Sequence, residues 1–397
     1  MTTRFKYIIV GAGMMGAAAA RHLSKRSDGV ALIGPAEPGD LRTHRGVFAS
    51  HYDEARITRT IDPDPVWARL ANRSIARYGQ IASDSGVDFY TETGCLIVAP
   101  RRTGGPSYVG DVLAAAGRLD VSTQTFDNQA LAQEFPCFDF PEDSEGVFEA
   151  RNAGFINPRK LVKAQTVLSK RQGCSLFRET VTSIREVGSQ VMVMTEEGNV
   201  YHGDKVLVAA GGFTIREGIL PRRIDLRAYA RTVAFYEVDD RVTSGWGAMP
   251  SLIWKWSEDD EGIYLLPPVR YPDGKTYLKI GGDPDDLRLK RESDIRAWFR
   301  SGGREGTHGH LAAVFTRLMP KLGLRSTSMA ACVTVFTPTG YPVISMAGSS
   351  RIGVLAGGCG AAAKSSDEIG RLGAELLIEG RVKDEAYTAD FDARFLN

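Results

Sequence analysis

Apolar runs separated by glycine turns and amphipathic stretches divide the chain. Residues 5–10 (FKYIIV) form a continuous apolar run, which predicts a strand buried on both faces of a sheet. GAGMMG and the helix-forming stretch AAAARHLSKR follow it directly. Further buried strands are predicted at 29–34 (GVALIG), at 204–212 (DKVLVAAGG) and before the glycine turn AGGCG near residue 356, which leads into another helix. Three strand-to-glycine segments, near residues 10, 210 and 356, predict one discontinuous nucleotide-binding domain with other material inserted between its parts.

The intervening segments alternate between helical and extended patterns. Amphipathic spacing predicts helices over 64–83, over 158–173 from Pro158, and over 310–322, closed by Pro320. The stretch 86–100 (GVDFYTETGCLIVAP) is typical of a hairpin.

The first glycine turn matches the dinucleotide-binding fingerprint. In such a turn Gly11 permits the tight bend, Gly13 the approach of pyrophosphate and Gly16 close helix packing. The free N–H groups and dipole of the helix N-terminus favour a phosphate there. A turn used only for packing is the alternative, but the flanking strand and helix favour an adenine dinucleotide.

The usual acid for the adenosine ribose is missing from the second strand. Gly34 and Pro35 follow that strand, and the first acid is Glu37. Either Glu37 reaches back from the loop to the ribose or the ribose is held otherwise.

Composition is that of an ordinary globular protein. The 397 residues include 49 basic and 48 acidic side chains, so a net charge of +1 argues against a nucleic-acid partner. No apolar run is long enough to span a bilayer, and the N-terminus runs into a strand without a signal peptide. We therefore expect a cytoplasmic protein without a membrane partner.

Cysteine and histidine spacing indicates no metal site. The five cysteines are scattered without a C-x-x-C pair, so neither a disulfide framework nor a zinc site is predicted. His308 and His310 could form a metal pair, but polar loop residues are the preferred interpretation.

Two arginines stand three positions apart in ASHYDEARITR (49–59). Arg56 and Arg59 could form a salt-bridge cluster with Asp53 and Glu54. They could also present fixed charge to an anionic substrate, since guanidinium binds carboxylate in a planar, bidentate manner.

Seven segments together resemble a known family. In order they are VGAGMMG, SHYDEARITR, YTETGCLIVAP, LVAAGGF, YLKIGGD, CVTVFTPTGYPVI and AGGCGAAAKSS. The chain resembles the flavoprotein amine oxidases of the D-amino-acid-oxidase superfamily, in the monomeric sarcosine oxidase and N-methyl amino acid oxidase branch. The resemblance implies an α/β fold with a Rossmann-like FAD-binding domain of the glutathione-reductase type and an antiparallel-sheet substrate domain. The expected FAD-binding parts are 1–88, 149–218 and 335–397, and the substrate domain comprises 89–148 and 219–334.

The resemblance also assigns cations to the active site. It places Arg56 beside the flavin and Arg59 on the substrate carboxylate. Lys279 matches a lysine above flavin N5 that speeds the reduction of oxygen, because a fixed cation stabilises developing superoxide. A solvent-facing lysine is the alternative for Lys279. Lys364 would be a further carboxylate ligand, although the family's lysine lies two positions earlier, and a solvent-facing helix lysine is equally open.

Two positions concern the flavin link and substrate identity. Cys332 matches the cysteine that members with covalent FAD attach to the flavin, and a packed strand residue is its alternative. Thr334 stands where a carboxylate-binding tyrosine is typical, and Cys359 stands where histidine is frequent.

The remaining expectations concern FAD contacts and the reaction. The expected FAD-binding residues are Gly11, Gly13, Met14, Met15, Gly16, Glu37, Ser50, His51, Arg56, Ala210, Gly211, Cys332, Gly357, Gly358, Gly360 and Lys364. We expect a monomer that oxidises an amino acid or N-alkylated amino acid to an imine and reduces oxygen to hydrogen peroxide. A dehydrogenase that passes electrons to a quinone or carrier protein, and a flavin-binding protein without turnover, are the alternatives.

Overall fold

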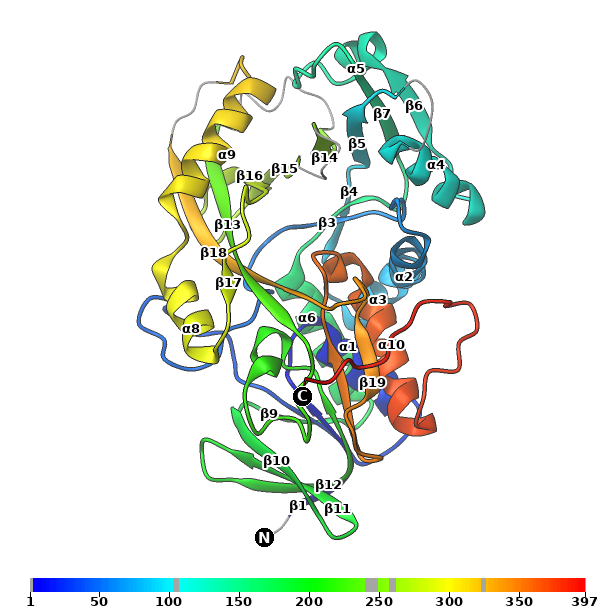
Figure 1. Ribbon diagram of the computed structural model, residues 1–397, viewed down its shortest axis with the longest axis vertical. Coiled ribbons are helices and arrows are strands. Elements are labelled where there is room, and N and C mark those ends of the chain that lie inside the picture. The colour runs from blue at the N-terminus through cyan, green and yellow to red at the C-terminus, as the bar shows by residue number, and fades with distance from the viewer. Residues whose placement is uncertain (1–2, 103–106, 240–248, 257–261, 323–325, 397) are drawn as a thin grey trace.

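The computed structural model describes residues 3–102, 107–239, 249–256, 262–322 and 326–396. In this part of the chain two large sheets lie one above the other along the long axis of the molecule, with β1 in the lower one and β13 in the upper one (Figure 1). Within the described residues, no helix is both long and apolar enough to cross a membrane.

The lower sheet has eight strands and a parallel centre. Parallel pairing joins β9, β2, β1, β12 and β20 in that spatial order, while β10, β11 and β19 add antiparallel edges. The strands are β1 Thr3–Val10, β2 Val30–Ile33, β9 Ser175–Phe177, β10 Val181–Val187, β11 Gln190–Thr195, β12 Val200–Val208, β19 Val343–Met346 and β20 Ile352–Ala356. All four residues of β2 and all five of β20 are buried, as expected for strands covered on both faces.

Helices from distant parts of the sequence pack beside this sheet. Helix α1 (Met14–Ser24) contacts both α6 (Pro158–Arg171) and α10 (Ala362–Glu379), and α10 also contacts α2 (Pro65–Ile75). The Rossmann-like architecture expected from the glycine turns is therefore present.

The upper sheet has nine strands, all antiparallel neighbours except β5 and β14, which run parallel. Its strands are β5 Cys95–Pro100, β6 Gln124–Asp127, β7 Ser144–Glu149, β13 Arg227–Val238, β14 Ser251–Lys255, β15 Gly262–Arg270, β16 Thr276–Gly281, β17 Arg288–Leu289 and β18 Thr327–Phe336. The accompanying helices are α4 Tyr108–Arg118, α5 Asn128–Glu134, α8 Glu292–Ser301 and α9 Glu305–Leu318. A three-stranded sheet of β3 (Arg56–Thr58), β8 (Gly154–Ile156) and β4 (Tyr90–Glu92) is a separate element.

Two predicted elements are wrong in detail. The helix expected over 64–83 is divided into α2 and α3 (Tyr78–Ser85), because the backbone tightens where the Arg77 N–H donates to Ser74. The expected hairpin over 86–100 does not form, since β4 pairs with β8 while β5 pairs with β7 and β14. Gly94 (φ +77) redirects the chain between the two strands, and its N–H donates to the Ala153 carbonyl.

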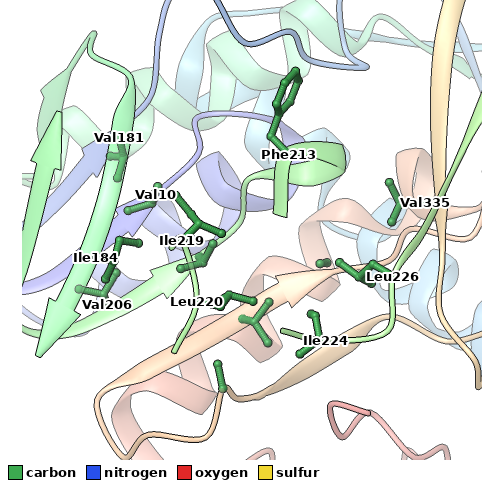
Figure 2. Packing of buried hydrophobic residues seen from close by; sticks show 14 of the residues in the cluster. Val10, Val181, Ile184, Val206, Phe213, Ile219, Leu220, Ile224, Leu226 and Val335 are labelled. Atoms are coloured by element: carbon green, nitrogen blue, oxygen red, sulfur yellow. The ribbon is translucent and has the colours of Figure 1, made fainter. Parts of the chain in front are cut away.

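A hydrophobic cluster supports the ends of the parallel strands (Figure 2). It joins Val10 and Val206 in the parallel centre of the lower sheet to Val181 and Ile184 of its edge strand β10, and to Phe213 after β12. Val10, Val181 and Phe213 also line the cavity that is described below. Residues of the hydrophobic core therefore hold part of the cavity lining in position.

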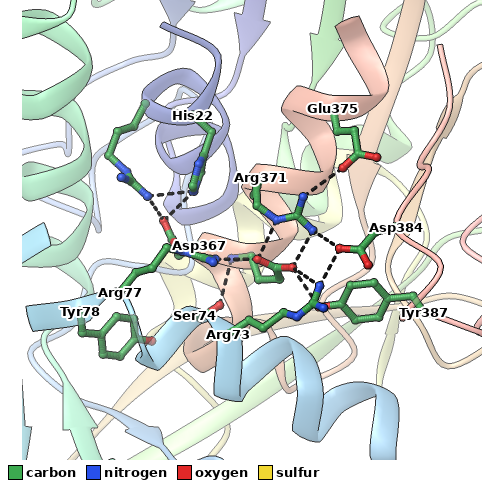
Figure 3. Close-up of polar contacts among 12 residues, drawn as sticks. His22, Arg73, Ser74, Arg77, Tyr78, Asp367, Arg371, Glu375, Asp384 and Tyr387 are labelled. Atoms are coloured by element: carbon green, nitrogen blue, oxygen red, sulfur yellow. Dashed lines mark hydrogen bonds and ion pairs between the residues drawn. The ribbon is translucent and has the colours of Figure 1, made fainter. Parts of the chain in front are cut away.

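A buried ionic network joins α10 to α1, α2 and α3 (Figure 3). Asp367 and Glu368, adjacent on α10, are both fully buried. Asp367 accepts hydrogen bonds from Arg21, Gln165 and Arg77, and Glu368 accepts from Arg77 and Arg371. Sequence reasoning did not identify this network.

Candidate active site

The first glycine turn has the backbone that only glycine allows. Gly11 has φ +111, and a Cβ there would collide with the Ala209 carbonyl. A Cβ at Gly16 would collide with the Gly11 carbonyl, so α1 can approach the turn only with glycine at that position. Gly13 is the N-cap of α1 and receives no side-chain cap, and the first turn has no acid. The free N–H groups of this turn suit an anion.

A cavity opens above this turn and collects segments that are far apart in the sequence. Its walls come from β1 and β2, residues 47–52, the chain after β12, strand β18, and the turn before α10. Of the expected site residues, those on the cavity wall are Gly11, Gly13, Met14, Met15, Ser50, His51, Arg56, Ala210, Gly211, Cys332, Thr334, Gly357, Gly358 and Gly360. The glycine turns at residues 11, 211 and 357 therefore meet at one site.

The structure shows where Glu37 and Gly34 lie, the two positions that concern the missing acid for the adenosine ribose. Glu37 lies in a second depression that His51 also lines, and Arg159 donates to both of its carboxylate oxygens at 2.9 Å. Gly34 faces the glycine turn, where an added Cβ would lie 2.5 Å from the Ala12 nitrogen. A side chain at this position would therefore collide with the turn, which accounts for the missing acid.

The lysine on β16 is buried, not solvent-facing. The side chain of Lys279 is 1% exposed, and its Nζ donates to Asp53 Oδ2 at 2.5 Å and to the Ala55 carbonyl at 2.6 Å. Asp53 also contacts Arg56 and accepts from the Tyr271 hydroxyl at 2.8 Å. Burial, followed by the charge of Arg56, lowers the pKa of Lys279 well below its usual value.

Arg59 and Lys364 meet on one carboxylate, that of Asp62. Arg59 Nη2 lies 3.0 Å and Lys364 Nζ 2.7 Å from the same oxygen, Asp62 Oδ2. The Lys364 side chain is only 2% exposed, so the solvent-facing alternative is wrong. Neither Arg59 nor Lys364 belongs to the cavity wall, but Ala362 and Ala363 directly before Lys364 do.

The salt-bridge interpretation of the arginine motif is partly right. Arg56 contacts Asp53, as that alternative expected, but Arg59 pairs with Asp62, and Glu54 pairs with Arg159 at 2.7 Å. Sequence reasoning missed Asp62, although its spacing of three from Arg59 repeats the Asp53–Arg56 spacing. That recurrence of opposite charges three positions apart is the sequence signal that could have revealed it.

Glu149, at the end of β7, is a further buried carboxylate near this cluster. It accepts hydrogen bonds from the backbone N–H groups of Thr60 and Ile61 and from the Thr60 hydroxyl. Burial raises the pKa of Glu149 to about 7, against the hydrogen bonds and Arg59, which lower it. Nothing in the sequence around residue 149 indicates this position.

Strand β18 presents Cys332 and Thr334 to the cavity. Cys332 Sγ lies 3.6 Å from Arg56 Nη2, and Trp298 donates to the Cys332 carbonyl. Thr334 Oγ1 is buried and has no hydrogen-bond partner among the described residues. Cys359 has a left-handed backbone (φ +46) in the turn before α10.

The two histidines considered as a metal pair lie in helix α9, so the loop interpretation is wrong. Among the described residues, no group of three or more His, Cys, Asp or Glu side chains could hold a metal ion.

Comparison with protein families identifies the chain. A model of FAD-dependent oxidoreductases, the DAO family, matches residues 6–376. The chain belongs to this family of FAD-dependent oxidoreductases. It is 24% identical to monomeric sarcosine oxidase of Bacillus sp. (strain NS-129), covering 97% of this chain and 96% of that one. It is 27% identical over 209 residues to N-methyl-L-tryptophan oxidase of Yersinia pestis (strain Pestoides F), covering 52% and 53% of the chains.

Solved structures share the fold. The Tyr258Phe mutant of NikD, described as an unusual amino acid oxidase, superposes with a TM-score of 0.78 at 19% identity, covering 100% of this chain and 99% of that one. L-proline dehydrogenase from P. horikoshii superposes with a TM-score of 0.75 at 17% identity, covering 99% and 97%. At these identities the likeness establishes the fold alone.

The residues of the cavity fit FAD, the cofactor of this family. The glycine turn at residues 11–16 offers uncapped N–H groups to a pyrophosphate. Gly357 (φ +78) and Gly360 (φ +76) let the backbone of the last turn border the cavity ahead of the α10 N-terminus, which has no side-chain cap either. A helix N-terminus at that place suits a ring that gains negative charge on reduction.

Proposed function

We propose that this flavoprotein oxidises the C–N bond of a small amine or amino acid to an imine, with oxygen as acceptor and hydrogen peroxide as product. The observation that supports the proposal most directly is that Arg56 lies on the cavity wall and contacts Asp53, the same carboxylate that binds the buried Lys279, so two cations meet at this wall. Buried charges are costly, and ionisable groups with strongly shifted pKa values beside a cavity are typical of functional sites. We also propose the domain division given above, a monomer and a cytoplasmic location.

The chain's own residues have separate roles in this proposal. Bound FAD supplies the redox chemistry by accepting two electrons from the C–N bond and giving them to oxygen. Lys279 would hold positive charge at a fixed, buried position, where it stabilises a developing oxygen anion. No described side chain needs to be a strong base if the amine binds in its neutral form, since that form already has a free lone pair.

The test is anaerobic mixing of the holoprotein with amines, amino acids and their N-methyl derivatives. We expect at least one of them to bleach the flavin absorbance, and air to restore it with release of hydrogen peroxide. A flavin that no compound bleaches would rule out amine oxidation. Bleaching that air does not reverse would indicate a dehydrogenase with another acceptor.

Cys332 is proposed as the site of a covalent flavin link. Its sulfur lies on the cavity wall, and alternation along β18 places the side chains of Cys332 and Thr334 on the same face. After acid precipitation we expect the yellow colour to stay with the protein, and Cys332→Ala to release it into the supernatant. Cys359→Ala is the matched control, because Cys359 also lies in the family motifs and should leave the colour bound. Release of colour from the wild type would make Cys332 a packing residue only.

A further inference from the structure

The second depression, the one that contains Glu37, runs along one face of helix α6. The helix positions that line it are 159, 162, 163, 166, 167 and 170, and residues three and four apart share one side of a helix. The loop after β2 and the end of β9 complete its wall. Of the described residues, only Ala12, Pro35 and His51 line both the depression and the FAD cavity. None of the α6 residues lines the cavity, so the depression is a neighbouring space with a wall of its own.

This wall has an excess of positive charge. Its cations are Arg159, Lys163, Lys170 and Arg178. Arg159 is already paired with two carboxylates, those of Glu37 and Glu54, each at 2.7 Å. The other three side chains are exposed and form no hydrogen bond or ion pair with a described residue. Three cations from two elements of the fold are therefore available to an anion from solvent.

The charge of the depression also acts on His51, which lines both spaces. Burial lowers the pKa of this histidine most, and the charges of Arg159, Arg178 and Arg56 lower it further, to about 4. The imidazole is therefore neutral at pH 7. Because two of these arginines line the depression, their positive potential extends to the wall that the depression shares with the cavity.

The rest of the lining is apolar and includes one buried hydroxyl. Val162, Val167 and Leu176 line the depression. Thr166 lies between the two valines, is 7% exposed, and its Oγ1 has no hydrogen-bond partner among the described residues. A helical threonine can satisfy its hydroxyl on a carbonyl one turn earlier, so this hydroxyl remains available to a ligand. Apolar lining with a few polar groups and cations is the composition of a small-molecule site.

We infer that the second depression binds a phosphate ester with an apolar or aromatic body, of the nucleoside-phosphate class, as a ligand separate from FAD. Lys163, Lys170 and Arg178 would bind the phosphate oxygens, because ammonium and guanidinium groups form charge-assisted hydrogen bonds with phosphate. The apolar residues would cover the body of the ligand, and the Thr166 hydroxyl would donate to one of its oxygens. The inference does not depend on amine oxidation.

The experiment is calorimetric titration of the holoprotein with AMP, adenosine and inorganic phosphate. Excess FAD in the buffer keeps AMP out of the FAD cavity. We expect AMP to bind at least about tenfold more tightly than adenosine or phosphate, because only AMP contacts both the cations and the apolar lining. The affinity for AMP should fall as salt is raised, since the three cations are exposed.

A charge-deleted variant and a matched control locate the site. Lys163→Gln combined with Lys170→Gln should weaken AMP binding about tenfold or more, because it removes two charged partners of the phosphate. Lys160→Gln is the control, since Lys160 is exposed on the same helix but does not line the depression. It should leave the affinity for AMP unchanged.

Four outcomes would overturn the inference. They are no AMP binding by the holoprotein, equal AMP binding by wild type and the double variant, phosphate binding as tight as that of AMP, and loss of FAD together with AMP from the double variant. The third would indicate an inorganic anion site, and the fourth would make the depression part of the FAD site. Both lysines are exposed, so the double variant should unfold at the same urea concentration as the wild type. If it does not, the preference of the wild type for AMP over adenosine and phosphate decides the inference.

Discussion

Lys279→Met should slow the reaction of the reduced enzyme with oxygen by about a hundredfold or more, while reduction by substrate stays within a few-fold of the wild type. Removing one oriented, buried charge that stabilises a developing anion costs about 3–4 kcal/mol in comparable sites. Hydride departure from the substrate gains little from this charge, so the two half-reactions should separate. The measurement is anaerobic stopped-flow reduction followed by mixing with aerated buffer.

Lys275→Met is the matched control for this variant. Lys275 lies just before the same strand, pairs with Glu237 at 2.7 Å, and has a side chain that is 50% exposed. Solvent screens such a charge, so its removal should change neither half-reaction. Equally fast reoxidation of Lys279→Met and wild type would exclude Lys279 as the site of oxygen activation.

The oxygen reaction should also depend on pH through Lys279. Burial lowers the pKa of this lysine well below its ordinary value of 10.5. The charged form predominates below the folded-state pKa, so the rate should be high there and should fall as pH rises through that value. The fall should therefore occur at a pH well below 10.5 in the wild type and should be absent from Lys279→Met. A fall of the same size in both proteins would assign it to another group.

The parts of the site that rest on backbone conformation could be predicted from the sequence. Gly11 and Gly16 each meet a steric requirement of the turn, so their spacing is visible in the sequence itself. The buried strands β2 and β20 were equally clear, because strands covered on both faces are continuously apolar. These features are local, and the parallel centre of the lower sheet follows from them.

The partners of the charged residues could not be predicted in the same way. Lys364 and Asp62 are 302 residues apart in the chain, and only the packing of α10 beside β3 brings them together. Residue type gave no indication that Lys279 or Lys364 is buried, since lysine is mostly exposed in proteins. The failed hairpin at 86–100 has a similar cause, because β4 and β5 pair with β8 and β7, which lie far along the chain from them: Glu92 pairs with Gly154, and Pro100 pairs with Ser144.

Glu368→Gln should destabilise the folded protein by about 3 kcal/mol at neutral pH. Glu368 is fully buried and accepts hydrogen bonds from Arg77 at 2.6 Å, from Arg371 at 2.8 Å and from the Tyr387 hydroxyl at 3.0 Å (Figure 3). Burial raises the pKa of Glu368, but the guanidinium groups of Arg371 and Arg77 lower it more. The resulting pKa is about 2, compared with an ordinary value of 4.5. At ~1.4 kcal/mol for each pKa unit, this shift corresponds to about 3 kcal/mol, which agrees with the ~3–5 kcal/mol cost of breaking a buried ion pair.

The pH dependence of the lost stability tests whether the charge of Glu368 is its cause. A carboxylate with a depressed pKa stabilises the fold above its unfolded-state pKa of about 4.5, and the stabilisation is lost as pH falls towards 2. The difference in unfolding free energy between wild type and Glu368→Gln should therefore be full at pH 7 and shrink below pH ~4.5. Urea unfolding of the holoprotein at a series of pH values measures it.

Glu379→Gln is the control, because it removes a carboxylate charge from the same helix at a position that is not buried. Glu379 pairs with Lys383 at 2.7 Å near the exposed end of α10, where solvent screens the pair. Its replacement should leave the urea midpoint nearly unchanged at every pH.

The Glu368 network also holds the part of α10 that follows the cavity turn, since Tyr78, next to Arg77, donates to the Lys364 carbonyl at 2.9 Å. Loss of the Glu368 charge should therefore weaken FAD binding as well as lower the free energy of unfolding. If Glu368→Gln unfolds at a lower urea concentration but binds FAD as tightly as the wild type, the network stabilises only the packing of the helices.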